Sequence, residues 1–470
     1  MVPVTDSRYR ALRMATVRPR RTRVRRALLI LAAAAVTSVG SIALGPILTA
    51  PRMTDPIAAA LPSPSAARPS IAPEPVIRDE VYSGLGPDNS TRPVVSSLAI
   101  RVPEPTGLSA TPATRHALQA RLDQLRERYG VPGISVTILF PDGSSWLGVS
   151  GVADVGAKTP VTPSTSFAIA SVSKTFTSAL VIALAQDGKV ELDEPVRTYL
   201  PELKINTRIT VRQLLDHTSG LYDYFFHPTI DRLLLRDPEK RWDNADSLKY
   251  VSKSYFKPGT GWHYSNTNYL ILGMVAERMG DAPLGEQIRD RFLEPLGLRH
   301  TWYQPTETPT SAVAHGYRFE STAKDARAID LSDGTVFMPF TSVVTAAGGA
   351  GGLASNSGDL ARWARALYAG GVLTPESVDA ILGDISRTEL YKPRVPYGLG
   401  VQRVDIDGAE SLGHSGRLLG FRSAVRWLPE EDIAIAVLTN QSRTDPGVFV
   451  RALLKIARSG ATCVNCTSQR

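Results

Sequence analysis

Cysteine is scarce in this sequence, and its position narrows the possible chemistry. Cys463 and Cys466 are the only cysteines, and both lie in the last eight residues of the 470-residue chain. The rest of the chain therefore has no disulfide framework and no cysteine nucleophile. A lone C-x-x-C pair in a tail, without a second ligand pair, does not by itself indicate a metal or redox role. We interpret it as an incidental or locally oxidised pair.

Two common catalytic patterns are also missing. The seven histidines form no H-E-x-x-H or H-x-x-x-H pair, and the sequence contains no G-x-S-x-G elbow. We therefore expect no metal and no organic cofactor. A serine hydrolase or an acid–base hydrolase remains as the enzyme class to test.

The positive charge is confined to one end of the chain. Residues 1–26 hold nine arginines and one acidic residue, which accounts for the whole net charge of +8. The remaining residues carry equal numbers of basic and acidic side chains, so the body has no excess positive charge to attract the phosphate backbone of a nucleic acid. We expect no nucleic-acid partner.

An uncharged segment follows the basic one. Residues 27–50 contain no charged side chain and, as a helix, would extend about 36 Å, enough to cross a bilayer core. Arginines on one flank predict a cytoplasmic N-terminus and an exported body. A cleaved signal peptide is the alternative, because Ser41-Ile42-Ala43 offers a small-x-small site and Arg25-Arg26 a partial twin-arginine signal. Either reading places the body outside the cytoplasm.

Composition divides the rest of the chain. Residues 51–112 hold 12 of the 34 prolines and are predicted to be an extended linker. Residues 113–458 have the mixed composition of a folded domain, and 459–470 form a tail. With 43% hydrophobic and 21% charged residues, the chain can bury a sizeable core.

The pattern of apolar residues predicts strands at both ends of this domain and helices between them. Expected strands cover 134–140, 146–152, 421–428 and 433–438, with tight turns inside each pair. Expected helices cover 115–129, 174–186, 269–279, 357–369 and 447–457. We predict an α/β (α+β) fold in which an antiparallel sheet is built from both ends of the domain, flanked by helices, with a mainly helical region inserted.

The first candidate catalytic pair is Ser171 and Lys174. Residues three apart share a helix face, so the lysine amine can reach the serine hydroxyl and act as its base when neutral. Ser-x-x-Lys also occurs at Ser254/Lys257 and Ser321/Lys324. Only Ser171 opens a long apolar helix, because Lys257 precedes a proline and 321–324 is polar.

Two further motifs follow along the chain. Tyr264-Ser265-Asn266 is the only Tyr-x-Asn in the sequence, and a phenol beside a lysine can relay protons while an amide orients a substrate. His414-Ser415-Gly416 precedes the last pair of strands, and its glycine permits close approach to a strand edge. Each motif alone is more typical of a packed structural element.

Taken in order, the three motifs resemble those of the penicillin-recognising serine hydrolases, the family of class C β-lactamases and D-alanyl-D-alanine carboxypeptidases. The resemblance spans 113–458 and predicts the β-lactamase-like version of the fold above. Other segments that resemble the family are Leu214–Leu221, Pro258-Gly259 and Ala346–Gly349.

The resemblance implies a role for each residue of the first two motifs. Ser171 would be the acylated nucleophile and Lys174 its proton acceptor. Tyr264 would be the partner of that base, and Asn266 would position the substrate amide. His217 resembles a family residue with a structural role.

The third motif would form the other wall of the site. By the same resemblance, His414 and Ser415 would contact the substrate carboxylate. Gly416 would allow close approach, and the backbone N–H groups of Ser171 and Arg417 would hold the oxyanion. A histidine in place of the lysine usual in class C β-lactamases resembles the peptidase branch.

The sequence thus predicts an exported hydrolase that forms an acyl-enzyme on amide or ester bonds, with a D-alanyl-D-alanine carboxypeptidase-like peptidase as the leading activity. Its partner would be a small peptide or ester, such as a peptidoglycan stem peptide or a β-lactam, and its membrane contact the N-terminal segment. A β-lactamase or carboxylesterase on the same core is the alternative. A non-catalytic envelope protein that only binds peptide is the second.

Overall fold

The computed structural model describes residues 108–321, 326–383 and 396–460. The predicted N-terminal segments 1–26 and 27–50, nearly all of the linker 51–112 and the tail beyond Gly460 lie outside these ranges. Both cysteines lie there too. Within the described ranges, no helix is both long and apolar enough to cross a membrane.

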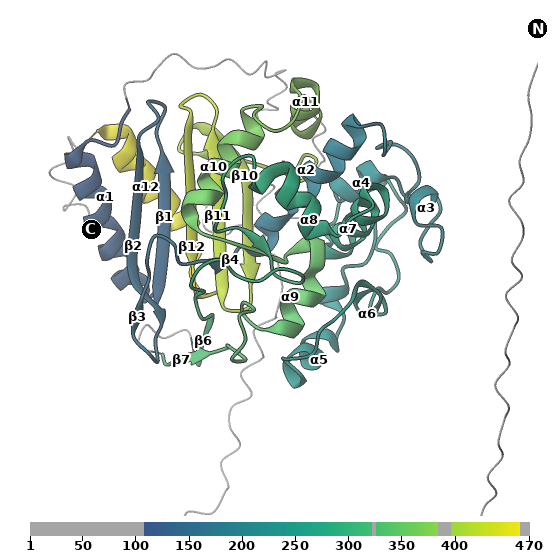
Figure 1. Ribbon diagram of the computed structural model, residues 1–470, viewed down its shortest axis with the longest axis horizontal. Helices are drawn as coiled ribbons and strands as arrows, with labels where there is room; N and C mark the ends of the chain where they lie inside the picture. The colour runs from purple at the N-terminus through teal and green to yellow at the C-terminus, as the bar shows by residue number, and fades with distance from the viewer. Residues whose placement is uncertain (1–107, 322–325, 384–395, 461–470) are drawn as a thin grey trace, which may run out of the picture. The chain divides into compact units, whose positions relative to one another are not determined.

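A seven-stranded antiparallel sheet forms the centre of the fold, in the order β3-β2-β1-β12-β11-β10-β9. Strands from the two ends of the domain lie side by side in Figure 1, which confirms the predicted architecture. Ile134 of β1 pairs with Thr439 of β12. The strands are β1 (Gly133–Leu139), β2 (Ser145–Asp154), β3 (Thr159–Pro160), β9 (Gln402–Ile406), β10 (Ala409–Leu418), β11 (Phe421–Leu428) and β12 (Ile433–Thr439).

Helices cover both faces of this sheet. Strand β12 is therefore buried on both faces. Every residue in it is buried, and successive side chains enter two different cores. Ile433, Ile435 and Val437 pack towards α1 (Pro112–Tyr129) and α12 (Gly447–Ser459). Their neighbours along the strand face α10 (Ser357–Tyr368) and the helical region. A strand buried on both faces reads as a continuous apolar run, as this one does.

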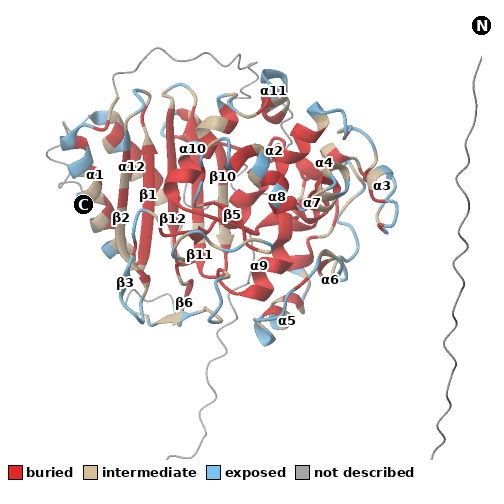
Figure 2. Cartoon of the chain, viewed as in Figure 1, coloured by how far each residue is buried: buried red, intermediate tan, exposed pale blue. Residues whose placement is uncertain are grey.

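The helical region lies between β3 and β9 in the chain, as predicted. Figure 2 shows its α2 and α7 among the most buried elements. Its helices are α2 (Ser173–Gln186), α3 (Val196–Tyr199), α4 (Val211–Leu215), α5 (Ile230–Arg236), α6 (Asn244–Leu248), α7 (Asn266–Gly280), α8 (Leu284–Ile288), α9 (Thr341–Ala347) and α11 (Pro375–Gly383). Short strands β4 (Phe167–Ala168), β5 (Trp302–Tyr303) and β8 (Leu353–Ser355) form a second sheet, and β6 (Tyr317–Phe319) pairs with β7 (Ala328–Asp330).

The start of α2 differs in detail from the prediction. Ser171 does not open this helix; it lies in a 3-10 turn, η1 (Ala170–Val172), and α2 begins at Ser173. Ala170 adopts a left-handed conformation with φ of 49°, which turns the chain sharply before the helix. Helix α2 is buried along Ser173–Leu184, and the aromatic stack of Phe176 on Trp363, with centroids 4.0 Å apart, packs it against α10.

Candidate active site

The Lys174 amine is the centre of the site. Its side chain is fully buried, and Nζ lies 3.0 Å from Ser171 Oγ, 2.7 Å from Asn266 Oδ1 and 2.8 Å from the Ala350 carbonyl oxygen. The two carbonyl-type oxygens can only accept hydrogen bonds. A neutral amine has two N–H groups and one lone pair, so donating to both oxygens directs its lone pair at the Ser171 hydroxyl. The surroundings therefore orient the amine as a base towards the serine.

Asn266 is held in the orientation that this arrangement needs. Its Nδ2 donates to Asp223 Oδ2 at 2.9 Å, and a carboxylate can only accept, so Oδ1 must face the lysine. Asp223 is fully buried, and its other oxygen accepts from the Phe225 N–H at 3.0 Å. Asp223 thus acts through Asn266, and nothing in the three sequence motifs pointed to it.

Tyr264 lies against the same amine. Its side chain is buried, and its ring centroid is 4.9 Å from Lys174 Nζ. The His217 imidazole packs against this ring, with 4.3 Å between centroids. His217 Nδ1 accepts from the Ser265 N–H and from Asn268 Nδ2, both at 3.2 Å. His217 therefore fixes the turn that carries Tyr264 into α7, in keeping with the structural role expected for it.

The third motif lies on β10 beside the turn that carries the serine. A Cβ atom added to Gly416 would lie only 2.4 Å from the Ile169 carbonyl oxygen, so only glycine fits there. The Ser423 hydroxyl on the neighbouring strand donates to the same carbonyl at 2.7 Å. This contact sets Ser171 against the strand edge where Arg417 follows Gly416. The oxyanion role of the Ser171 and Arg417 N–H groups stays a prediction.

His414 is buried, and both of its ring nitrogens are engaged within the protein. Nδ1 lies 2.6 Å from the Ser415 carbonyl oxygen and so carries the proton, while Nε2 lies 3.0 Å from the Tyr397 hydroxyl and accepts from it. Ser415 donates its N–H and its hydroxyl to Gln402 Oε1, both at 3.1 Å, and buried Arg426 donates to the same oxygen at 2.8 Å. His414 therefore holds the motif in place through contacts inside the protein, and Ser415 is more exposed than His414.

Both buried imidazoles are held neutral. Burial lowers the pKa of His217 and of His414 well below the usual histidine value, and the Lys174 amine, when it is protonated, lowers the pKa of both further. The site therefore has one amine that can carry a proton among neutral aromatic groups.

The other sequence candidates lie elsewhere. Ser254 and Lys257 are exposed, and Lys324 lies outside the described residues. Three aromatic residues follow Asp223 in the sequence; Tyr224 and Phe225 are buried in the main core, whereas Phe226 is exposed. The sequence motifs did not identify three further groups at the site: Tyr397, Gln402 and the Ala350 carbonyl. Tyr397 and Gln402 contact the motif residues His414 and Ser415, and Ala350 contributes only a main-chain atom, so no short motif records them.

Known proteins resemble the chain along most of this domain. A family model described as Beta-lactamase matches residues 118–458. Penicillin-binding protein 4 of Amycolatopsis lactamdurans is 29% identical over 339 residues, covering 68% of this chain and 84% of that protein. Unguisins hydrolase of Aspergillus campestris is 27% identical over 337 residues, covering 67% of this chain. The match spans 60% of that hydrolase, less than two thirds of its length.

A solved structure resembles the fold at similar identity. The D-amino acid amidase of Ochrobactrum anthropi SV3, complexed with D-phenylalanine, superposes with a TM-score of 0.64 at 26% identity. The superposition covers 74% of this chain and 99% of the amidase. The likeness therefore extends over the amidase's whole fold.

The Asp223 contact yields a prediction about the reactivity of Ser171. Asp223→Ala should slow modification of Ser171 by a fluorophosphonate roughly 100-fold, because the Asn266 amide loses the partner that fixes its oxygen on Lys174. The rate would be followed by mass spectrometry, with circular dichroism to confirm folding. Asp193→Ala, which removes an exposed carboxylate paired with Arg212, is the matched control and should react at the parent rate. Equal rates for both variants would refute the role of Asp223.

The buried imidazoles yield a prediction about stability and pH. Because their pKa values are lowered on folding, the unfolded chain binds more protons than the folded protein below about pH 6.5. Stability should therefore decrease from pH 7 to pH 5, by up to about 1.4 kcal/mol per pH unit for each imidazole. Urea unfolding would measure the decrease. His414→Gln should lose less stability than the parent over this range, and His116→Ala, at an exposed position on α1, should lose as much. An equal loss in His414→Gln and the parent would contradict the assignment.

Proposed function

This chain belongs to the beta-lactamase family, and from that premise we propose that it is a serine hydrolase that cleaves amide or ester bonds through an acyl-enzyme on Ser171. The observation that carries the proposal is the set of contacts of the Lys174 amine with Ser171 Oγ, Asn266 Oδ1 and the Ala350 carbonyl oxygen. A binding protein would have no need of a base directed at a buried hydroxyl.

Acylation is the first step of the proposed reaction. Ser171 Oγ attacks the substrate carbonyl carbon while its proton passes to the neutral Lys174 amine. The negative charge that develops on the carbonyl oxygen is stabilised by the N–H groups of Ser171 and Arg417. The proton then passes to the leaving group, with the hydroxyl of Tyr264, whose ring centroid lies 4.9 Å from the amine, as its carrier, and the bond to the leaving group breaks.

Deacylation returns the enzyme to its starting state. A water molecule gives a proton to the Lys174 and Tyr264 pair and attacks the ester carbonyl. The carboxylic acid product leaves as Ser171 Oγ regains its proton. Neither step needs a metal or an organic cofactor.

We propose a D-alanyl-D-alanine-terminated peptide, such as a peptidoglycan stem peptide, as the leading substrate class. Similarity to a penicillin-binding protein and to a D-amino acid amidase supports it. His414 in place of a lysine brings no charge to the site, and both its nitrogens are engaged within the protein. The contact with the substrate carboxylate would therefore be made by Ser415, after its hydroxyl turns away from Gln402. A β-lactamase or a carboxylesterase would use the same core.

We further propose that the protein acts outside the cytoplasm. The basic segment 1–26 and the uncharged segment 27–50 support this location.

The test of the enzymatic proposal is intact-mass measurement of the full-length protein after mixing with benzylpenicillin, with antibiotic hydrolysis followed in parallel. We expect a persistent adduct on Ser171 that is absent in Ser171→Ala. Ser254→Ala is the matched control, since it removes the exposed serine of another Ser-x-x-Lys pair, and it should keep the adduct.

Other outcomes of that measurement separate the alternatives. Rapid antibiotic turnover would identify a β-lactamase. Reaction with simple esters alone would identify a carboxylesterase. Failure of the folded protein to react with benzylpenicillin, D-alanyl-D-alanine peptides or esters would support the non-catalytic reading, and an adduct that persists in Ser171→Ala would disprove the nucleophile.

Export has its own expected result. When the source cell or a related host is fractionated, the protein should be found in the membrane or the medium. The N-terminus of the recovered protein would distinguish the two forms, because an anchor leaves residues 1–50 in place, whereas a signal peptide is removed near Ala43. Recovery of the unprocessed chain in the cytoplasm would contradict the proposed location.

A further inference from the structure

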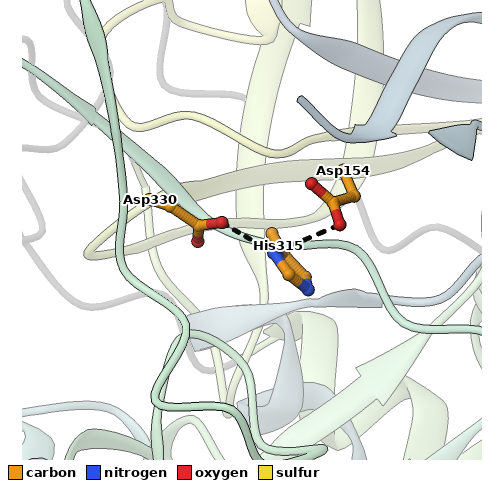
Figure 3. Close-up of side chains that lie close together, drawn as sticks. All are labelled: Asp154, His315 and Asp330. Atoms are coloured by element: carbon orange, nitrogen blue, oxygen red, sulfur yellow. Dashed lines mark hydrogen bonds and ion pairs between the residues drawn. The ribbon is translucent and has the colours of Figure 1, made fainter. Parts of the chain in front are cut away.

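A second group of chemically active side chains lies outside the candidate active site. It consists of Asp154 at the end of β2, His315 just before β6 and Asp330 at the end of β7. Figure 3 shows the two carboxylates approaching the imidazole from opposite sides. The three residues come from three separate segments, so their meeting is a product of the fold.

The distances suit a small metal ion. His315 Nδ1 lies 2.7 Å from Asp330 Oδ2 and 4.0 Å from Asp154 Oδ2, and one ligand atom from each residue lies within 4.8 Å of the others. Ligand atoms about 2.0–2.2 Å from a tetrahedral zinc ion are about 3.3–3.5 Å apart. The observed distances bracket that separation, so small side-chain rotations would complete the geometry.

A backbone N–H group holds one oxygen of each carboxylate, and the other oxygen faces the imidazole. Asp330 Oδ2 is hydrogen-bonded to His315 Nδ1 at 2.7 Å, a contact that a bound metal ion would replace. Asp154 Oδ1 accepts from the Ala157 N–H at 3.0 Å, and Asp330 Oδ1 accepts from the Ser332 N–H at 2.9 Å. The Oδ2 atoms are the ones that face the imidazole. Hydrogen bonds of this kind orient metal ligands in known sites.

The charge balance also favours a cation. Among the residues that the structure describes, neither Asp154 nor Asp330 forms an ion pair with a lysine or arginine.

We propose that Asp154, His315 and Asp330 bind one divalent transition-metal ion, with Zn²⁺ as the best match. One imidazole nitrogen and two carboxylate oxygens are donors that zinc accepts, whereas Ca²⁺ and Mg²⁺ prefer oxygen ligands alone. All three side chains are partly exposed, so water can complete the coordination. The ion would fasten the β6–β7 pair to the end of β2 and stabilise the fold without taking part in the reaction at Ser171.

The test is a zinc titration of the full-length protein by calorimetry, together with its thermal unfolding temperature. All samples would carry Cys463→Ser and Cys466→Ser, because thiolates in the tail could bind zinc themselves. We expect one Zn²⁺ per chain and a rise in the unfolding temperature on zinc addition. In His315→Ala the zinc affinity should fall by more than about 100-fold. Loss of a residue that only hydrogen-bonds to a metal ligand lowers metal affinity by about 10- to 100-fold, so a larger decrease would identify His315 as a ligand.

Two further variants keep the test decisive. Asp154→Asn preserves size and should also weaken zinc binding, which covers the case in which His315→Ala does not fold. His116→Ala removes an exposed histidine on α1 and should bind zinc as the parent does. Unchanged zinc affinity in folded His315→Ala or Asp154→Asn, no zinc binding by the parent, or Ca²⁺ binding as tight as Zn²⁺ binding would each overturn the proposal.

Discussion

The structure depends on one buried lysine amine held between two oxygens that can only accept hydrogen bonds. Burying an amine without hydrogen-bond partners is costly, and Lys174 is completely covered by protein. Asn266 Oδ1 and the Ala350 carbonyl oxygen satisfy two N–H groups and leave the third position to the Ser171 hydroxyl. The same contacts that make burial tolerable therefore direct the lone pair of the neutral amine at the nucleophile.

The fold supplies each of these contacts from a different part of the chain. Helix α2 carries the lysine, α7 begins with Asn266, and Ala350 closes the short turn after α9. The sheet then brings β10 alongside the turn of Ser171, where Gly416 leaves room for the Ile169 carbonyl. A sheet made from both ends of the domain achieves this, because it places late strands next to early ones.

The sequence predicted the local features well and the long-range ones poorly. The spacing of Ser171 and Lys174 and the apolar run of α2 are local, so they could be interpreted without a structure. Asp223 lies 43 residues from the Asn266 that it orients, and Ala350 lies 176 residues from Lys174 and contributes only a backbone oxygen. Main-chain atoms and second-layer side chains leave no signature in a short motif. The Asp154, His315 and Asp330 group was missed for the same reason, since its members meet only in the folded chain.

The most direct test of this account is the acylation rate of Lys174→Met, measured by rapid mixing with a reactive ester or a β-lactam that acylates the parent protein. Methionine fills nearly the same volume without a base, so the fold should persist. A positioned general base contributes about 10²–10⁴-fold to such a step, and we predict a loss of this size. A folded Lys174→Met protein that is acylated within a few-fold of the parent rate would contradict the claim that the lysine activates Ser171.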